Sequence, residues 1–283
     1  MKLTTALAAL MLAAAMAVAA CGDDDDDGGD GNGGGQADTP AGAAQLTISE
    51  TAQGLEVEGT PAPGVAEITL QNDGKKPATA QLIRATGGES RKEVEKVYSG
   101  AGEGEPIPDW FRAEGGPGTT APGESSTATL ELEEGTYYAV NDEDKPEVSP
   151  AFEVSGDASD AELPETDASV IADDYSFEAR GLQAGDSQVV FENAGEEPHH
   201  VLALPIVPGK TFEDAERFLK TEKGKPAVNF EKGTFSTVID GGKTMVIDVA
   251  LQKGDYALVC FISDRAGGRS HFDKGMISEA AVE

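Results

Sequence analysis

The stretch Gln188-Val-Val-Phe-Glu-Asn-Ala-Gly-Glu-Glu-Pro198 has a near copy earlier in the chain, Glu67-Ile-Thr-Leu-Gln-Asn-Asp-Gly-Lys-Lys-Pro77. In both copies a short run rich in apolar and β-branched residues leads into a turn built on Asn, Gly and Pro. Runs of this kind, bounded by turn residues, are typical of the strands of an all-β sandwich. The two copies therefore predict two similar β-rich units in one chain.

A second pair of segments supports this interpretation. Leu130-Glu-Leu-Glu-Glu-Gly-Thr-Tyr-Tyr-Ala139 recurs as Val249-Ala-Leu-Gln-Lys-Gly-Asp-Tyr-Ala-Leu258, in the same order and at nearly the same separation. We therefore expect a tandem duplication. Each unit is also expected to contain one short helix, since Ser90-Arg-Lys-Glu93 has the pattern of a capping box and Thr211 that of an N-cap. The strands expected in the second unit are 169–177, 187–192, 199–206, 234–239, 244–251, 255–262 and 276–282.

Residues 1–20 are expected to be a targeting segment and not part of the fold. Ala6–Ala20 is an apolar run of about fifteen residues, shorter than the roughly 20 that a membrane-spanning helix needs. The run ends Val18-Ala-Ala-Cys-Gly22, which resembles the lipobox of bacterial lipoproteins. That resemblance implies cleavage before Cys21, lipidation of Cys21 and anchoring to the extracytoplasmic face of the cell membrane. The alternative is an ordinary secretory signal cut near Ala20.

Segments of low complexity divide the remaining chain. Residues 21–44 contain Asp23–Asp27 and almost no large apolar side chain, so they predict a disordered tether. The acidic stretch 156–166, rich in small residues, predicts a linker. We expect one domain over residues 45–155 and a second over residues 167–283, each of ordinary domain size.

The net charge excludes some partners. The chain carries 52 acidic and 21 basic residues, a formal charge of −31. Binding to nucleic acid or to anionic lipid headgroups is not expected, because such affinity depends on Lys and Arg side chains. A solvated exterior is the simplest interpretation of the charge, and attraction of a basic redox partner remains open.

The residues best suited to chemistry gather in the last third of the chain. The three histidines are His199, His200 and His271, and Cys260 and Met276 lie beside them in the sequence. Once Cys21 is lipidated, Cys260 has no cysteine with which to pair, and a lone thiol outside the cytoplasm is a liability unless it is buried, metallated or reactive. Imidazoles, a thiolate and a thioether are ligands of soft, redox-active metals, copper above all.

The order of these residues resembles that of the cupredoxins, the blue copper proteins. His199 follows Pro198 and an Asn-Gly turn, Cys260 ends an apolar run, and His271 precedes Met276 by the usual spacing. The resemblance implies two tandem cupredoxin-like Greek-key β-sandwiches, each with a short inserted helix. It further implies one copper ion held by His199, Cys260, His271 and Met276, and electron transfer to a partner protein without catalysis by this chain.

One interval departs from the family pattern. Ten residues separate Cys260 from His271, where cupredoxins have far fewer. If both residues bind copper, this segment must double back, and Asp264–Gly268 is the expected place. On a strand, His199 and His200 would point to opposite faces, so at most one binds the metal, and the position after proline favours His199. An inert core thiol at Cys260 is the rival reading. The alternative function is then a copper-free interaction or ligand-binding module at the cell envelope.

The first unit contains no histidine or cysteine. Its positions equivalent to His199 and Cys260 are Ala78 and Asn141, so it cannot hold such a metal and is expected to serve as a structural or partner-binding module. The sequence also has no glycine-rich phosphate loop before a helix, and it gives no sign of a hydrolase or a nucleotide-dependent enzyme.

Overall fold

The computed structural model describes residues 40–101, 104–142 and 145–283. The expected signal peptide (1–20), the lipidation residue Cys21 and most of the expected tether (21–44) lie outside these residues. Strands predominate in the described part, as the all-β expectation requires. None of the helices in this part is both long and apolar enough to cross a membrane.

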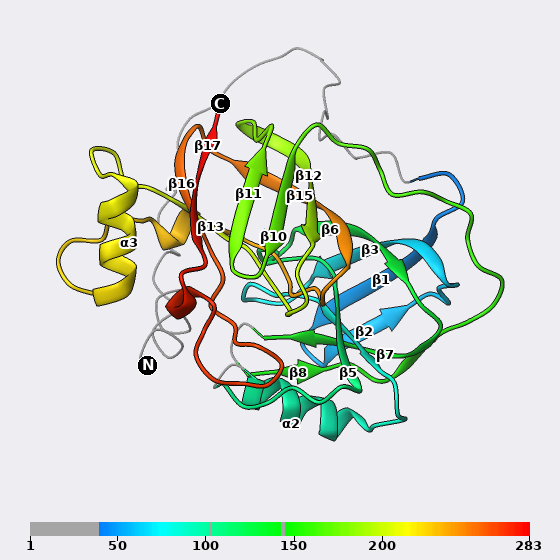
Figure 1. The fold of residues 1–283 in the computed structure, drawn as a ribbon. Coiled ribbons are helices and arrows are strands. Elements are labelled where there is room, and N and C mark those ends of the chain that lie inside the picture. Colours follow the sequence, from blue (N-terminus) through cyan, green and yellow to red (C-terminus); the bar gives the residue numbers. More distant parts are fainter. Residues whose placement is uncertain (1–39, 102–103, 143–144) are drawn as a thin grey trace, which may run out of the picture. The chain divides into compact units, whose positions relative to one another are not determined.

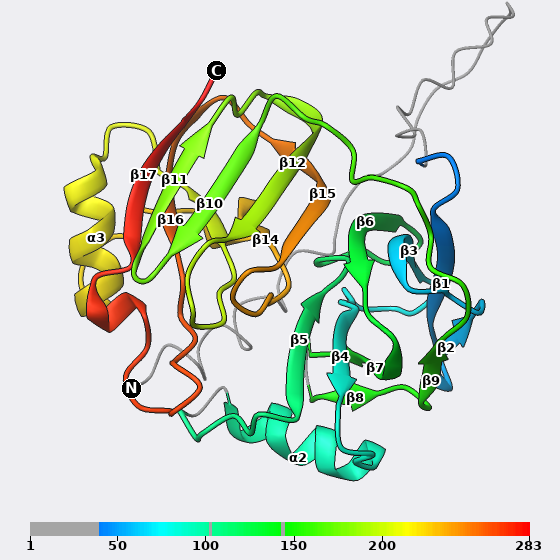
Figure 2. The ribbon, with the colours of Figure 1, turned by 45° about the vertical axis from the view of Figure 1, so that its right-hand side comes forward.

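The first half forms two facing sheets (Figures 1 and 2). One sheet has the order β6-β3-β1-β2; the other has the order β5-β4-β7-β8, with β9 paired to β7. Leu46 and Ile68 from the first sheet pack with Leu82 and Tyr137 from the second in one buried cluster. The elements are β1 (Ala44–Thr51), β2 (Gly54–Glu58), β3 (Gly64–Asn72), β4 (Gln81–Ala85), α2 (Arg91–Ala101), β5 (Phe111–Gly115), β6 (Ser125–Leu132), β7 (Gly135–Asn141), β8 (Glu147–Val148) and β9 (Phe152–Val154).

The second half repeats this plan. One layer has the order β11-β10-β12-β15 and the other β14-β13-β16-β17, with Phe191 and Leu258 among the side chains between them. β10 and β12 pair in parallel, as β1 and β3 do in the first half. The elements are β10 (Ser169–Asp173), β11 (Ser176–Arg180), β12 (Gly185–Asn193), β13 (Leu202–Pro205), α3 (Phe212–Thr221), η1 (Phe230–Lys232), β14 (Thr234–Phe235), β15 (Thr244–Leu251), β16 (Gly254–Val259), η2 (Phe272–Lys274) and β17 (Ile277–Val282).

One sheet continues through both halves. β15 pairs with β6 in antiparallel register, Val246 opposite Thr129, and this joins four strands of each half into one eight-stranded sheet. Residues Thr39–Glu283 accordingly form a single compact unit. The halves are therefore fixed against each other by main-chain hydrogen bonds, in addition to being linked through residues 156–166.

Each half has one helix, as expected. Thr211 caps α3, because its hydroxyl accepts the Asp214 N–H while the Asp214 carboxylate accepts the Thr211 N–H. Ala215 and Leu219 supply the buried face of α3. The predicted strand 169–177 is wrong in one respect: it is a hairpin, with β10 and β11 joined by a turn at Asp174 and Tyr175. Both of these side chains are used in tertiary contacts, which a local β-pattern does not reveal.

The two copies of the Asn-Gly-Pro turn make the same hydrogen bonds. The Asn72 side chain donates to the Lys76 and Thr120 carbonyls, and the Asn193 side chain donates to the Glu197 and Ile239 carbonyls, all at 2.8–2.9 Å. Each asparagine is buried and also accepts the N–H of the residue two positions later. Each asparagine thus ties its own turn to the neighbouring chain segment.

We predict that Asn72→Ala and Asn193→Ala destabilise the protein similarly. Each change removes two side-chain hydrogen bonds to main-chain carbonyls and one from a main-chain N–H, and each such hydrogen bond contributes about 0.5–1.5 kcal/mol. Urea unfolding of the two variants measures this free energy. If the free energy of unfolding falls in one variant and not in the other, the two turns are not energetically equivalent.

Candidate metal centre

His199 lies directly after the Asn193 turn. Its main-chain N–H donates to the Ile239 carbonyl at 3.0 Å, and its carbonyl accepts the Ile239 N–H at 2.9 Å. Asn193 donates to the same Ile239 carbonyl, so the turn and the histidine are anchored at one point. The His199 side chain is fully buried.

Cys260 follows the last residue of β16 and is also fully buried. Its carbonyl accepts the Phe272 N–H at 2.8 Å, and its N–H donates to the Met276 carbonyl at 3.5 Å. The end of β16 is therefore bonded to the segment that contains His271. These bonds place the thiol beside the turn that follows the ten-residue interval.

The interval between Cys260 and His271 doubles back. Ser263 and Ser270 form an antiparallel bridge, and the Gly267 N–H donates to the Asp264 carbonyl at 2.8 Å. The reversal lies within Asp264–Gly268, where the sequence predicts it. His271 returns to the site, where its N–H donates to the Ile262 carbonyl at 2.7 Å and its ring is fully buried.

Three donor atoms converge as a result. The Nδ1 atoms of His199 and His271 are 3.0 Å apart, and the Cys260 Sγ lies 3.8 Å and 3.5 Å from them, respectively. Metal bonds of about 2.0–2.3 Å place ligand atoms around one ion about 3–4 Å apart. The triangle fits a single ion, and two imidazoles with one thiolate are a donor set that suits copper.

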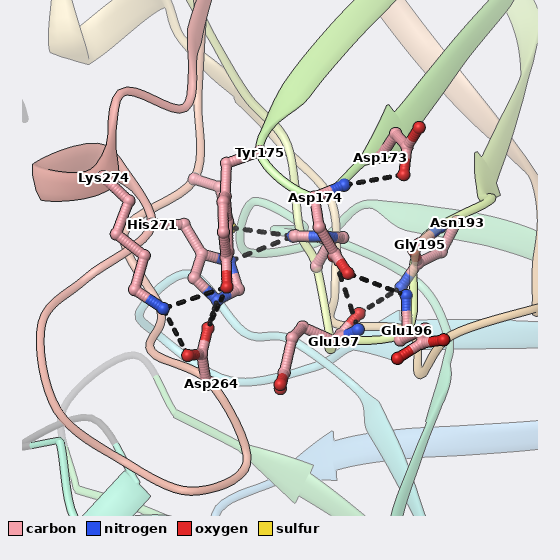
Figure 3. A network of polar contacts seen from close by, with 12 residues as sticks. Asp173, Asp174, Tyr175, Asn193, Gly195, Glu196, Glu197, Asp264, His271 and Lys274 are labelled. Carbon is pink, nitrogen blue, oxygen red and sulfur yellow. Dashed lines mark hydrogen bonds and ion pairs between the residues drawn. The ribbon is translucent and has the colours of Figure 1, made fainter.

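The outer nitrogen of each imidazole meets a carboxylate. Asp174 Oδ1 lies 2.8 Å from His199 Nε2, and Asp264 Oδ1 lies 3.0 Å from His271 Nε2. Asp174 also accepts the Glu196 N–H at 3.0 Å, a contact drawn in Figure 3. Burial would raise the pKa of Asp174, but these hydrogen bonds outweigh it, so the pKa is lowered and the carboxylate is ionised at neutral pH.

The carboxylates fix which ring nitrogen carries the proton. Burial lowers the pKa of His199, and burial together with His199 lowers the pKa of His271 to about 4, so both rings are neutral at pH 7. An ionised carboxylate only accepts hydrogen bonds, so the proton of each neutral ring is on Nε2. Two Nδ1 lone pairs then face each other at 3.0 Å. Such a contact is stable only with a cation or a shared proton between the lone pairs.

The thiol is the third ligand atom. Burial raises the pKa of Cys260 to about 12, against the opposing effect of the His200 and Ile262 backbone N–H groups. The metal-free thiol is therefore protonated at neutral pH. Since a metal binds the thiolate, metal binding must displace this proton.

His200 has a different task from His199. Its Nε2 accepts the Phe261 N–H at 3.1 Å, so its ring holds the chain just after Cys260 and is not one of the three converging donors. Met276 is fully buried in the same core cluster as Cys260, and its N–H donates to the His271 carbonyl at 2.9 Å. The structure thus brings the Met276 main chain to the site, and its role as a fourth ligand stays a prediction.

Sequence reasoning missed the polar residues around the triangle. Asp264 also accepts the Tyr175 hydroxyl at 3.0 Å and pairs with Lys274, whose ammonium donates to the same hydroxyl (Figure 3). The Tyr175 ring packs on the His271 ring with centroids 5.0 Å apart. Asp264 lies in the unusual interval, which was a signal that the interval has a function. The sequence around Asp174 contains no comparable signal, because Asp174 lies in a turn within the predicted strand 169–177.

The equivalent place in the first half is filled by hydrogen bonds. Ala78 makes the same bridge to Thr120 that His199 makes to Ile239. The Asn141 amide oxygen accepts the Thr79 N–H at 3.1 Å. These contacts complete the strand ends without a metal.

No protein-family model matches the chain, and no curated protein matches it at a significant level. Several solved structures are similar to the chain at low scores. Auracyanin B, a cupredoxin, is 16% identical over 43% of this chain and 93% of its own, with a TM-score of 0.27. The auracyanin of the photosynthetic bacterium Roseiflexus castenholzii is 10% identical over 41% and 94%, with a TM-score of 0.27. A copper nitrite reductase from Nitrosomonas europaea is 15% identical over 85% and 94%, with a TM-score of 0.24. Because these values are low, fold and site are assigned from the sheets and contacts described above.

We predict that Cys260 of the folded, metal-free protein resists alkylation. A pKa near 12, against an ordinary value of 9.0, lowers the thiolate fraction at pH 8 on the order of 1,000-fold, and burial blocks the reagent further. Iodoacetamide labelling at pH 8 should therefore be at least about 100-fold slower than in urea. A Cys21→Ser background leaves one thiol to follow. Rapid labelling without urea would contradict the buried site.

Proposed function

We propose that this chain is an electron-transfer protein with one type 1-like copper ion, bound by His199, Cys260 and His271. The observation that carries the proposal is the convergence of two Nδ1 atoms and one sulfur within 3.0–3.8 Å of each other. A copper ion bound there supplies a one-electron redox couple. Met276, buried and bonded through its main chain to His271, is the proposed weak fourth ligand.

Rigidity of the ligands supports electron transfer. Main-chain hydrogen bonds hold His199 to Ile239, Cys260 to Phe272 and His271 to Ile262. The carboxylates of Asp174 and Asp264 fix the rotation of the two rings. A ligand set that cannot rearrange keeps the same geometry in both oxidation states, which favours rapid electron exchange.

Burial of the ligands supports a carrier over an enzyme. The side chains of His199, Cys260 and His271 have no exposed surface, so a small substrate has no open approach to a metal bound among them. Catalysis at a second, imidazole-bound copper would need further histidines. Within this sequence the third histidine, His200, is engaged with the Phe261 N–H.

The proposed location follows from the N-terminal pattern. The lipobox-like sequence at Cys21 supports a lipid anchor that holds the protein at the extracytoplasmic face of the cell membrane. The redox partner would then be a protein in the same compartment. The strongly negative charge favours a partner with a basic surface.

Copper titration of the reduced protein tests the copper site. We expect one Cu(II) per chain and an intense visible band from thiolate-to-copper charge transfer. His199→Ala should abolish the band, because it removes a donor from the triangle. His200→Ala is the matched control and should keep most of it, since the His200 ring accepts the Phe261 N–H and is not one of the three converging donors. A colourless wild-type protein would favour the copper-free binding module instead.

Cys21→Ser tests the anchor separately. If Cys21 is lipidated, the variant should lose labelling by a fatty-acid analogue and should leave the membrane fraction. The copper spectrum of the purified variant should be unchanged. A mature N-terminus at a residue other than 21 would refute the lipid anchor and leave the copper proposal intact.

A further inference from the structure

The loop 261–270, between two proposed ligands, makes contacts in two directions. Asp264 faces the site, where it lies 3.0 Å from the His271 Nε2 (Figure 3). The next residue, Arg265, reaches the half of the protein that has no histidine or cysteine. In Figures 1 and 2 this orange-red loop extends from the end of β16 toward the side of α2. Asp264 is thus held directly by Tyr175 and Lys274, and the loop that carries it is held through Arg265.

Arg265 is held by five groups, of which Asp240 and Glu197 belong to the second half. Its main-chain N–H donates to the Glu197 carboxylate at 2.7 Å. Its guanidinium donates to the Pro108 carbonyl at 3.2 Å and to the Phe111 carbonyl at 2.9 Å, and it pairs with Asp240 at 2.5 Å. Its own carbonyl accepts the Ile107 N–H at 2.8 Å. Only 17% of the side chain is exposed. A planar guanidinium can donate to several acceptors at once in fixed directions, which makes this a geometrically defined attachment.

The tip of the loop also touches the first half directly. The Gly268 N–H donates to the Gly104 carbonyl at 3.0 Å. A Cβ on Gly267 would lie 2.5 Å from that same carbonyl oxygen, and Gly267 has φ of +78°. The main chains therefore meet closely, at a point where a larger residue would force them apart. The first half supports the loop at both Arg265 and its glycine tip.

We propose that the ligand-free half is a positioning module for the metal centre. By holding Arg265 it fixes Asp264 against His271, and in this way it sets the affinity and redox potential of the bound copper. The inference rests on the proposed copper site. It gives a function to the half of the protein that has no metal ligands. Arg265 and Asp264 are positioning residues, because both act through His271.

The physical link is the bond between carboxylate and imidazole. A carboxylate on the outer nitrogen orients the ring and makes the inner nitrogen a stronger donor. Stronger donation favours the more highly charged, oxidised ion. A loop that is released from the first half should hold Asp264 less firmly, so Cu(II) should bind more weakly and the redox potential should rise.

A double-mutant cycle tests this chain of contacts. Asp264→Asn should weaken Cu(II) binding about 10- to 100-fold, the usual effect of losing such a partner. Arg265→Ala should weaken binding in the same direction by a smaller factor and raise the redox potential. Combined with Asp264→Asn, it should have no further effect, because its influence passes through Asp264. Affinity by competition with a chelator, and potential by spectroelectrochemistry, are the measurements.

Arg112→Ala is the matched control. Arg112 also lies near Asp240, at 3.9 Å, and carries the same charge, but its side chain is 38% exposed and is not among the groups that hold the loop. Its removal should change Cu(II) affinity by less than about twofold, in keeping with the small worth of an exposed ion pair. If Arg265→Ala does not fold, Arg265→Lys, which keeps the charge but not the fork of donors, takes its place in the cycle.

The outcomes separate the two proposals. Equal effects of the Arg265 and Arg112 variants, or effects of Arg265→Ala and Asp264→Asn that simply add, would overturn the positioning role and leave the copper site standing. A wild-type protein that binds no copper would overturn both. If Arg265→Ala weakens Cu(II) binding in the wild-type background but has no effect in the Asp264→Asn background, the first half acts on the metal through this loop.

Discussion

The contact between two imidazole nitrogens, 3.0 Å apart in a fully buried site, is the constraint on which this part of the structure depends. Neutral rings whose outer nitrogens donate to carboxylates cannot relieve it by changing tautomer. The fully buried site therefore has a donor geometry that a cation would stabilise. The nearby Cys260 thiol has a proton to give up, and its thiolate would complete the site around a cation.

Holding such donors together requires support from outside the triangle. Asp174 comes from the turn between β10 and β11, and Asp264 from the loop that follows β16, so each histidine is oriented by a different part of the fold. The Tyr175 hydroxyl and the Lys274 ammonium then neutralise and orient Asp264. Burial would raise the pKa of Asp264, but Lys274, Tyr175 and His271 outweigh it and lower the pKa, so the carboxylate stays ionised and accepts the ring N–H.

The continuous eight-stranded sheet gives these contacts a rigid frame. Pairing of β15 with β6 sets the two halves in one register, and this brings Pro108 and Phe111 to the place where Arg265 can reach them. In a protein whose halves moved freely about a linker, the loop 261–270 would keep its bonds to Asp240 and Glu197 but lose those to the first half. The sheet and the loop are thus two parts of one arrangement.

The sequence by itself determined the class of fold and the chemistry of the donors. Strand patterns, the repeated Asn turn and the Thr211 cap are local signals, so they could be read without tertiary structure, and His199, Cys260 and His271 stood out because their residue types are rare in this chain. Boundaries were less well determined: the predicted strand 169–177 proved to be a hairpin.

Only the tertiary structure decided how the site is built. It chose His199 over His200, folded the ten-residue interval back, and placed carboxylates behind both rings. It also joined the halves through β15 and β6. These features depend on pairings between residues far apart in the chain, whose energies come from burial and hydrogen-bond geometry, and no local pattern of residues encodes them.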